Sequence, residues 1–374
     1  MTELSFTQIE IDGFRGLRLL NLEDLGRINI LVGRNNSGKT SVLEALSILC
    51  QPQNPDEWLS MVSRRDFGGF DETIVQSLRW CFTQEIISDY ETLIEAKCKF
   101  KCNGNFPLRE LEIEYNEFIG EPSPEEIRRS FIKDKTMDSR IMRGADLTFI
   151  SSLLNNQLNL FLDNKKITTL RIWEDLPIRR RYSKNIGVNS KTLTPYSYQL
   201  NRNQLQLQSK YLFDKSSNVL ELLKDFDVDI QGIDIASFSG GLAAIYIKHR
   251  KLGIAPLSVF GDATRRAVLL ATTLLSLEEG GILLIDEIEV GIHVSALTAV
   301  FQWLVKAARE LKIQLFITTH SLEALDAIIS NYSLQNADDI VAFHLSQAPE
   351  KTQCKRFSSD LLHRLRFERG LDVR

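Results

Sequence analysis

A glycine-rich loop between an apolar run and a helical pattern constrains this chain more than any other stretch. Residues 28–32 carry four aliphatic side chains and predict a buried strand. Residues 33–40 follow directly and read G-x-x-x-x-G-K-T, the sequence of a phosphate-binding P-loop. From residue 42 to residue 49, apolar side chains recur at helical spacing. Because a P-loop needs a strand before it and a helix after it, we interpret this stretch as a nucleotide-binding site rather than a chance match in a turn.

The residue types in this loop fit a triphosphate and its metal ion. Backbone N–H groups of a P-loop converge on an anion, and the N-terminus of the following helix adds a positive partial charge. We expect Lys39 to contact the β- and γ-phosphates as a point charge and the Thr40 hydroxyl to bind Mg²⁺. Asn36 is expected to adopt a positive φ, which Asn tolerates better than most residues. The predicted ATP contacts in this stretch are Gly33, Arg34, Asn35, Asn36, Ser37, Gly38, Lys39, Thr40 and Ser41.

Two acidic residues at the end of a second apolar run supply the rest of a hydrolytic site. Residues 282–285 are all aliphatic and lead straight into Asp286 and Glu287. Asp286 is predicted to hold Mg²⁺ through water, opposite Thr40. Glu287 is predicted to orient or deprotonate the attacking water.

The order of the predicted elements brings these residues to one edge of a sheet. Apolar strands at 28–32, 282–285 and 313–317 alternate with helices, which predicts a mostly parallel sheet. Functional groups of such a sheet collect at the carboxyl ends of its strands. His320 follows the third of these strands, so we expect it to contact the γ-phosphate, although a lone histidine in this position is more often structural.

Outside this core, alternating patterns indicate an antiparallel β layer. Residues 6–20 and 91–118 alternate partly between apolar and polar side chains. Residues 119–215 show a less clear pattern of apolar and polar side chains, and they contain charged stretches that favour helix. Residues 179–184 form a basic cluster, which could contact nucleic acid or an acidic partner but is more often a solvated loop.

Composition excludes some classes of partner. The net charge of −4 predicts no global attraction to nucleic acid or to a membrane, while a local basic patch stays possible. No apolar run reaches membrane-spanning length, and the N-terminus does not have the pattern of a signal peptide. The five cysteines are scattered, which favours reduced thiols and a cytoplasmic protein.

The motifs together resemble the ABC-type ATPase family. They are the P-loop at 33–40, Asp-Glu-Ile-Glu-Val-Gly-Ile-His at 286–293 and Thr-Thr-His-Ser at 318–321. Within that family the chain is similar to the OLD-like ATPases, named for overcoming lysogenization defect. The branch is indicated by Gly-Phe-Arg-Gly at 13–16, by the stretch 256–266 in the signature position, and by the closing residues 369–374. The residues after His320 are too few for the Toprim nuclease domain of the long members, so we expect a stand-alone member.

The resemblance implies an ATP-sandwich dimer, in which the P-loop of one subunit faces the signature helix of the other. The signature helix is expected at 263–278, and its positive N-terminus can complete the γ-phosphate shell only from outside its own P-loop. The stretch departs from Leu-Ser-Gly-Gly-Gln because Val259 and Phe260 stand where glycines would be, so which residue touches phosphate stays open. Further candidates are Ser258, Gly261 and Asp262 in trans, Arg15 beside the nucleotide, and Gln84 as the residue that senses Mg²⁺.

These observations predict an α/β protein with a single ABC-type ATPase head over residues 1–374. We expect an N-terminal P-loop lobe with the antiparallel layer at 1–118, a largely helical insert at 119–215, and a C-terminal lobe at 216–374. The predicted function is Mg²⁺-dependent ATP hydrolysis by a homodimer or larger assembly that controls a separate nuclease or toxin, in antiphage defence. The alternatives are a RecF-like DNA-repair ATPase, which would bind DNA, and a scaffold that uses ATP only as structural glue. No membrane partner is expected.

Overall fold

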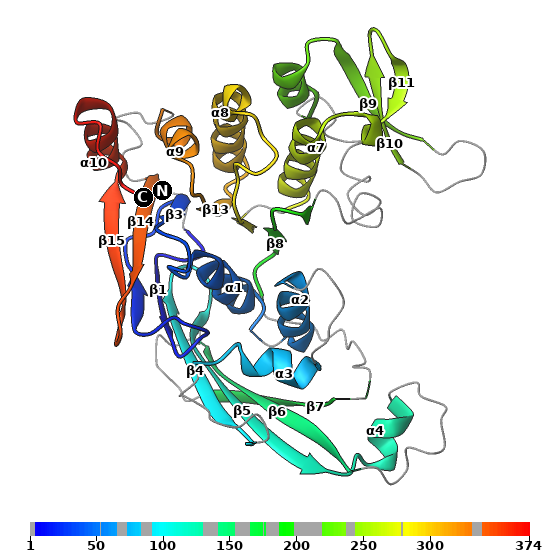
Figure 1. The fold of residues 1–374 in the computed structure, drawn as a ribbon, viewed down its shortest axis with the longest axis vertical. Coiled ribbons are helices and arrows are strands. Elements are labelled where there is room, and N and C mark those ends of the chain that lie inside the picture. Colours follow the sequence, from blue (N-terminus) through cyan, green and yellow to red (C-terminus); the bar gives the residue numbers. More distant parts are fainter. Residues whose placement is uncertain are drawn as a thin grey trace.

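Two six-stranded sheets and a smaller three-stranded sheet form the framework of the molecule (Figure 1). The computed structural model describes residues 4–52, 54–65, 73–83, 92–129, 141–153, 165–174, 176, 187–197, 219–236, 244–277, 280–330 and 339–374. No helix in these described ranges is long and apolar enough to span a membrane.

The central sheet has the strand order β15-β14-β3-β13-β12-β8 and is parallel except at one edge, where β15 pairs antiparallel with β14. The mostly parallel sheet predicted from the sequence is therefore confirmed. Its strands are β3 (Ile28–Val32), β8 (Ser190–Leu193), β12 (Ile282–Ile285), β13 (Gln314–Thr318), β14 (Ile340–Gln347) and β15 (Thr352–Ser358).

Both faces of the central sheet are covered, which explains why its strands are apolar on both sides. Ile28 and Ile30 of β3 belong to the core beneath the row of helices along the top of Figure 1. Leu31, the residue after Ile30, belongs to the other core, which contains the P-loop helix α1. The upper row consists of α7 (Asp262–Leu275), α8 (Val294–Glu310), α9 (Leu322–Ile329) and α10 (Ser359–His363), after which the π-helical turn η4 (Arg364–Glu368) follows.

The second sheet is antiparallel, with strand order β2-β1-β4-β5-β6-β7, and lies at the bottom of Figure 1. Three helices pack between it and the central sheet: α1 (Lys39–Cys50), α2 (Pro55–Arg65) and α3 (Ile74–Arg79). The sequence patterns at 6–20 and 91–118 correspond to its first four strands. The strands are β1 (Gln8–Asp12), β2 (Leu20–Leu22), β4 (Glu95–Asn103), β5 (Leu108–Gly120), β6 (Met142–Leu153) and β7 (Lys165–Trp173).

The prediction of a largely helical insert at 119–215 was wrong for the described part of that range. β6 and β7 extend the antiparallel sheet, β8 is an edge strand of the central sheet, and α4 (Pro124–Arg129) is a single short helix. The expected boundary at 118/119 falls inside β5. The charged pattern was misleading because a strand that covers a core on one face alternates with charged residues on the other.

A small antiparallel sheet precedes α7, the helix that is expected to carry the signature. It consists of β9 (Ile230–Ala236), β10 (Ala244–His249) and β11 (Gly253–Pro256), in the order β11-β10-β9. The short 3-10 helix η2 (Leu257–Val259) joins it to α7. The basic cluster at 179–184 lies outside the described residues.

Candidate nucleotide-binding site

The P-loop has the backbone geometry that its sequence predicts. Gly33 and Gly38 have φ values of 143° and 96°, where a side chain would be strained, and Asn36 has the expected positive φ of 62°. A Cβ on Gly38 would lie 2.6 Å from the Leu17 side chain. The loop therefore requires glycine at these positions.

Lys39 is folded over its own loop. Its Nζ donates hydrogen bonds to the carbonyl oxygens of Gly33 and Arg34, at 2.8 and 2.9 Å. Burial is the largest influence on its pKa and lowers it, while the negative charges of Asp286 and Glu287 act in the opposite direction. An ammonium group held by two carbonyl oxygens is ready to exchange them for the oxygens of a phosphate.

Thr40 and Asp286 meet from opposite elements. The Thr40 hydroxyl lies 3.2 and 3.1 Å from the two carboxylate oxygens of Asp286, which follows β12. The Thr318 hydroxyl donates to the same carboxylate at 2.6 Å and fixes its orientation. A hydroxyl oxygen beside a carboxylate is the oxygen donor set that Mg²⁺ prefers, so the residues present fit that ion.

Glu287 is held in an unusual backbone conformation beside them. Its φ is 46°, and its backbone N–H donates to the Thr318 hydroxyl at 2.8 Å. Partial burial raises the pKa of its carboxyl, and the nearby charges of Asp286 and Glu289 raise it further, against His320 and Lys39. A raised pKa suits a group that must accept a proton from water.

His320 follows β13 and lies close to Glu287. Its Nε2 is 3.8 Å from a carboxylate oxygen of Glu287. Its backbone N–H donates to Glu289 at 2.7 Å, so Glu289 links the ends of β12 and β13. The second carboxylate oxygen of Glu289 is buried and has no hydrogen-bond partner among the residues that the structure describes. The prediction had not included Glu289, which its place two residues beyond Glu287 could have suggested.

A cavity of about 950 Å³ lies over the P-loop. Most of the predicted site residues line it together: Arg15, Asn35, Asn36, Ser37, Gly38, Lys39, Thr40, Ser41, Glu287 and His320. Three predicted residues do not line the cavity but contact residues that do. The carbonyl oxygens of Gly33 and Arg34 bind Lys39, and the carboxylate of Asp286 binds Thr40. Arg15 contacts the P-loop helix through an ion pair with Glu44 at 2.6 Å.

The cavity has further walls that the sequence did not indicate. Trp80 and Thr83 line it from the segment after α3, and Arg18 from the turn before β2. Gln347, the last residue of β14, and Pro349, in the turn to β15, line it as well. Gln347 also donates to the carbonyl of Ser37 at 3.3 Å and so supports the P-loop. These residues come from separate parts of the chain and have no motif.

The predicted trans contacts lie apart from this cavity. Ser258, Gly261 and Asp262 are exposed around the N-terminus of α7 and do not line the cavity of their own chain. Gln84, the candidate for sensing Mg²⁺, lies outside the described residues. The roles of all four stay predictions.

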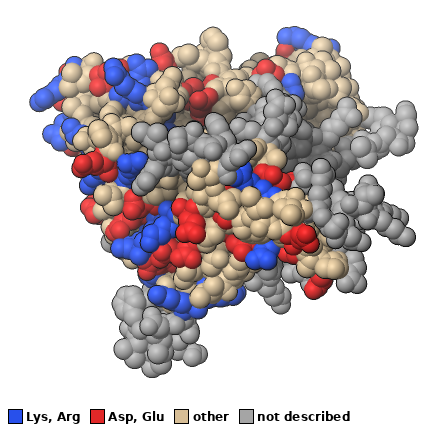
Figure 2. Space-filling model, turned by 60° about the horizontal axis from the view of Figure 1, so that its bottom comes forward, with Lys and Arg blue, Asp and Glu red and all other residues tan. Residues whose placement is uncertain are grey.

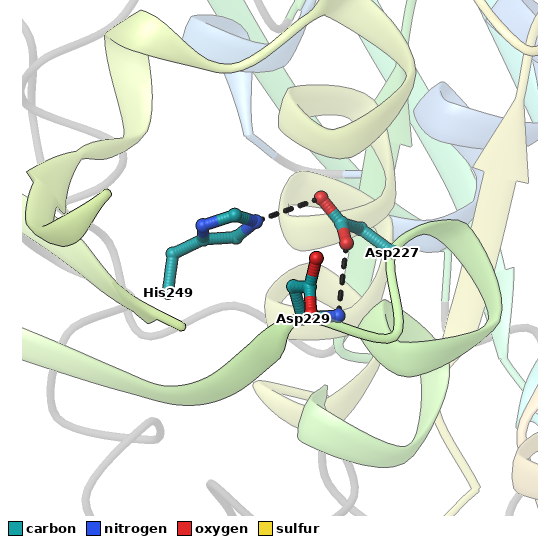
Figure 3. Close-up of side chains that lie close together, drawn as sticks. All are labelled: Asp227, Asp229 and His249. Carbon is teal, nitrogen blue, oxygen red and sulfur yellow. Dashed lines mark hydrogen bonds and ion pairs between the residues drawn. The ribbon is translucent and has the colours of Figure 1, made fainter. Parts of the chain in front are cut away.

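A separate group of two carboxylates and a histidine has a structural explanation (Figure 3). His249 directs Nε2 at Asp227, 3.1 Å away, and its Nδ1 accepts the backbone N–H groups of Lys251 and Leu252 at 3.2 and 3.1 Å. Asp229 forms an ion pair with Lys251. Because Nδ1 must present a lone pair, Nε2 carries the proton, and the histidine offers no lone pair to a metal ion.

The fold and the site together define an ABC-type P-loop ATPase head. A solved Smc head bound to the C-winged helix domain of ScpA has TM-score 0.50 and 11% identity, and the alignment covers 98% of this chain and 99% of that one. An Smc head with an extended coiled coil, bound to the C-terminal domain of ScpA derived from Pyrococcus furiosus, also has TM-score 0.50, with 9% identity over 99% of this chain and 100% of that one.

The chain belongs to the family described as "AAA domain, putative AbiEii toxin, Type IV TA system", whose model matches residues 28–326. A Helicobacter pylori protein named ATP/GTP phosphatase is 23% identical over 357 residues, which cover 86% of this chain and 87% of that relative. The DNA replication and repair protein RecF of Pseudomonas savastanoi pv. phaseolicola is 48% identical over 46 residues, 12% of each chain. The protein is an ATPase of this class.

Proposed function

We propose that this protein is an OLD-like, Mg²⁺-dependent ATPase whose ATP-bound dimer controls a separate effector, a nuclease or a toxin, in antiphage defence. The observation that carries the proposal is the meeting of Thr40 with Asp286 beside Lys39 at the edge of the central sheet. Separate strands of the parallel sheet deliver these groups to one place, as the sandwich ATPases require.

The hydrolytic step follows from the positions of the protein groups. Lys39 leaves the carbonyl oxygens of its loop and binds the β- and γ-phosphates, and Thr40 and Asp286 would hold Mg²⁺. The bound ion would neutralise charge on the phosphate oxygens. Glu287 accepts one proton from water as the water oxygen bonds to the γ-phosphorus and the bond to the β-phosphate oxygen breaks, which leaves ADP and phosphate.

A dimer would complete the site. The first backbone N–H groups of α7 have no partner within the helix, no side chain of the N-cap residue Gly261 caps them, and this terminus does not line the cavity of its own chain. The phosphate of a partner subunit is a ligand that such a terminus would bind. Ser258, Gly261 and Asp262 are therefore proposed to contact ATP in trans.

The effector is proposed from the family. Its description names the AAA-domain protein as a putative toxin of a type IV TA system, and a system of two components supports a pairing between this ATPase and a second protein. All five cysteines are free thiols, which supports a reducing cytoplasmic location.

The charge pattern of the antiparallel sheet disfavours the DNA-binding alternative, which the local similarity to RecF supports. In Figure 2 positive and negative side chains are interspersed over this side of the molecule. Lysines of β4 on its outer face pair with acidic residues of β5 and β1, which neutralises the positive stripe that phosphate binding needs. The pairs are Lys97–Glu112, Lys99–Glu110 and Lys101–Glu10.

Two variants test the proposed reaction. Glu287→Gln should bind ATP with the wild-type affinity but lower kcat by about 10²- to 10⁴-fold, because only the proton acceptor is lost. Lys39→Ala should lose ATP binding. Phosphate release and binding of a fluorescent ATP analogue are the measurements, and undiminished phosphate release by Glu287→Gln would refute the assignment of the base. Filter binding to duplex DNA at two salt concentrations tests the alternative.

A further inference from the structure

Arg266 connects the signature helix to the catalytic turn of the same subunit. It lies on α7 with 5% of its surface exposed. Nη2 donates to the carbonyl oxygens of Glu287 and Asp286 at 2.8 and 3.4 Å. Nη1 donates to the carbonyl oxygen of Pro195 at 2.9 Å and lies 3.5 Å from that of Thr194, after the edge strand β8. A single guanidinium thus holds backbone oxygens of two segments.

The turn that Arg266 holds is strained. Glu287 is a non-glycine residue at φ 46°, a strained conformation that persists only when the surrounding contacts enforce it. From one side, the Thr318 hydroxyl accepts the Glu287 N–H. From the other side, Arg266 binds the Glu287 carbonyl. The direction of the Glu287 carboxylate therefore depends on both contacts.

We infer that Arg266 is a positioning residue, which fixes Glu287 for proton abstraction and makes its position depend on that of helix α7. This inference rests on the proposed role of Glu287 as the base. Arg266 lies four residues beyond Asp262, the first residue of α7, which is about 6 Å along a helix. A movement of the helix N-terminus, where a partner's nucleotide would bind, therefore reaches the catalytic turn through one rigid helical turn and one side chain.

Arginine is required for this role because of its shape. The planar fork directs Nη1 and Nη2 at different carbonyl groups at the same time. A lysine ammonium is a compact charge and cannot span Pro195 and Glu287 together. Arg266→Lys should therefore keep the charge but loosen the turn.

The test separates turnover from nucleotide binding in Arg266→Met and Arg266→Lys. We expect kcat to fall about 10- to 100-fold in Arg266→Met, because a misplacement of about 1 Å costs that much in rate, and by an intermediate factor in Arg266→Lys. Affinity for a fluorescent non-hydrolysable ATP analogue should stay within about twofold of the wild type, because no contact to the P-loop is removed. Arg171→Met removes an exposed arginine of β7, paired with Asp146, and serves as the control that keeps the wild-type kcat.

The outcomes distinguish the inference from the proposed function. If the wild type hydrolyses ATP and both Arg266 variants keep its kcat, or if affinity falls as much as kcat, Arg266 does not position the base. If Arg266→Met does not fold, Arg266→Lys decides by the same two measurements. A wild type that releases no phosphate contradicts the proposed function instead.

Discussion

At the scale of single residues, the site depends on charges held close together in partial burial. Asp286, Glu287 and Glu289 follow one strand, and each affects the protonation of Lys39. The carboxylates oppose the lowering of the Lys39 pKa by burial, and Lys39 opposes the rise of the Glu287 pKa.

The first residue-scale prediction concerns pH. Glu287 acts as a base only when it is deprotonated, and its pKa is raised by burial and by Asp286 and Glu289, against His320 and Lys39. The rate should therefore fall as the pH falls through this raised pKa, at a higher pH than for an ordinary glutamate. The measurement is kcat against pH.

The matched variant for this profile is Glu289→Gln. It removes one neighbouring negative charge that raises the pKa of Glu287, so the fall of kcat on the acidic side of the profile should move to lower pH. If kcat falls at the same pH in this variant as in the wild type, Glu289 does not influence the protonation of Glu287.

The second residue-scale prediction concerns Trp80. The chain has four tryptophans, and all of them are within the described residues. Trp80 is 45% exposed and lines the cavity, while the other three are buried: Trp58, Trp173 and Trp303. Bound ATP should therefore change the emission of Trp80, since it alters the solvent around one indole. Trp80→Phe should lose this signal yet bind the fluorescent analogue, and a full response in that variant would place the nucleotide elsewhere.

At the scale of elements, a buried polar network fixes α3 against the antiparallel sheet. Arg79 of α3 donates to both carboxylate oxygens of Glu117 on β5, at 2.8 and 2.5 Å. The Tyr115 hydroxyl lies 2.7 Å from the same carboxylate. The segment after α3 continues into the cavity wall, and the Thr83 N–H donates to Gly13 at 2.9 Å. The network therefore stabilises the lobe and positions one wall of the site.

The element-scale prediction follows from the burial of that pair. The side chains of Arg79 and Glu117 are 4% and 0% exposed. Glu117→Ala should lower the free energy of unfolding by about 3–5 kcal/mol, because a buried guanidinium is left without its carboxylate. Lys99→Ala on the exposed face should cost less than about 1 kcal/mol. Urea denaturation measures both, and equal costs would contradict the argument.

At the scale of the whole molecule, the cavity lies over the P-loop, and the residues at the N-terminus of α7 do not line it. Ser258, Gly261 and Asp262, around that N-terminus, are exposed. A second copy is what would bring the two together, so assembly should depend on ATP.

The molecular prediction is ATP-dependent dimerisation. Glu287→Gln should trap ATP and form a dimer in the presence of ATP and Mg²⁺, because binding without turnover keeps the sandwich closed. Lys39→Ala should stay monomeric under the same conditions. Sedimentation velocity distinguishes the monomer from the dimer. A dimer that forms equally well without nucleotide would contradict ATP-dependent dimerisation.

The sequence by itself determined the P-loop, the acidic strand end and the parallel core. These features follow from local rules: apolar runs predict buried strands, and the loop sequence specifies its own backbone. The meeting of Thr40 with Asp286 was also predictable, because parallel strands deliver their carboxyl ends to one edge.

Only the tertiary structure decided the rest. Whether residues 142–153 form a strand depends on their pairing with β5 and β7, since β propensity depends strongly on context. Folding brings distant segments together, and this places Trp80, Gln347 and Arg266 at the site. The spacing of residues along the sequence does not indicate these contacts. Contacts made across the fold leave no periodic pattern in the sequence, which is the physical reason the sequence predicted the residues of the proposed catalytic centre but not the walls of the cavity or the contacts that support them.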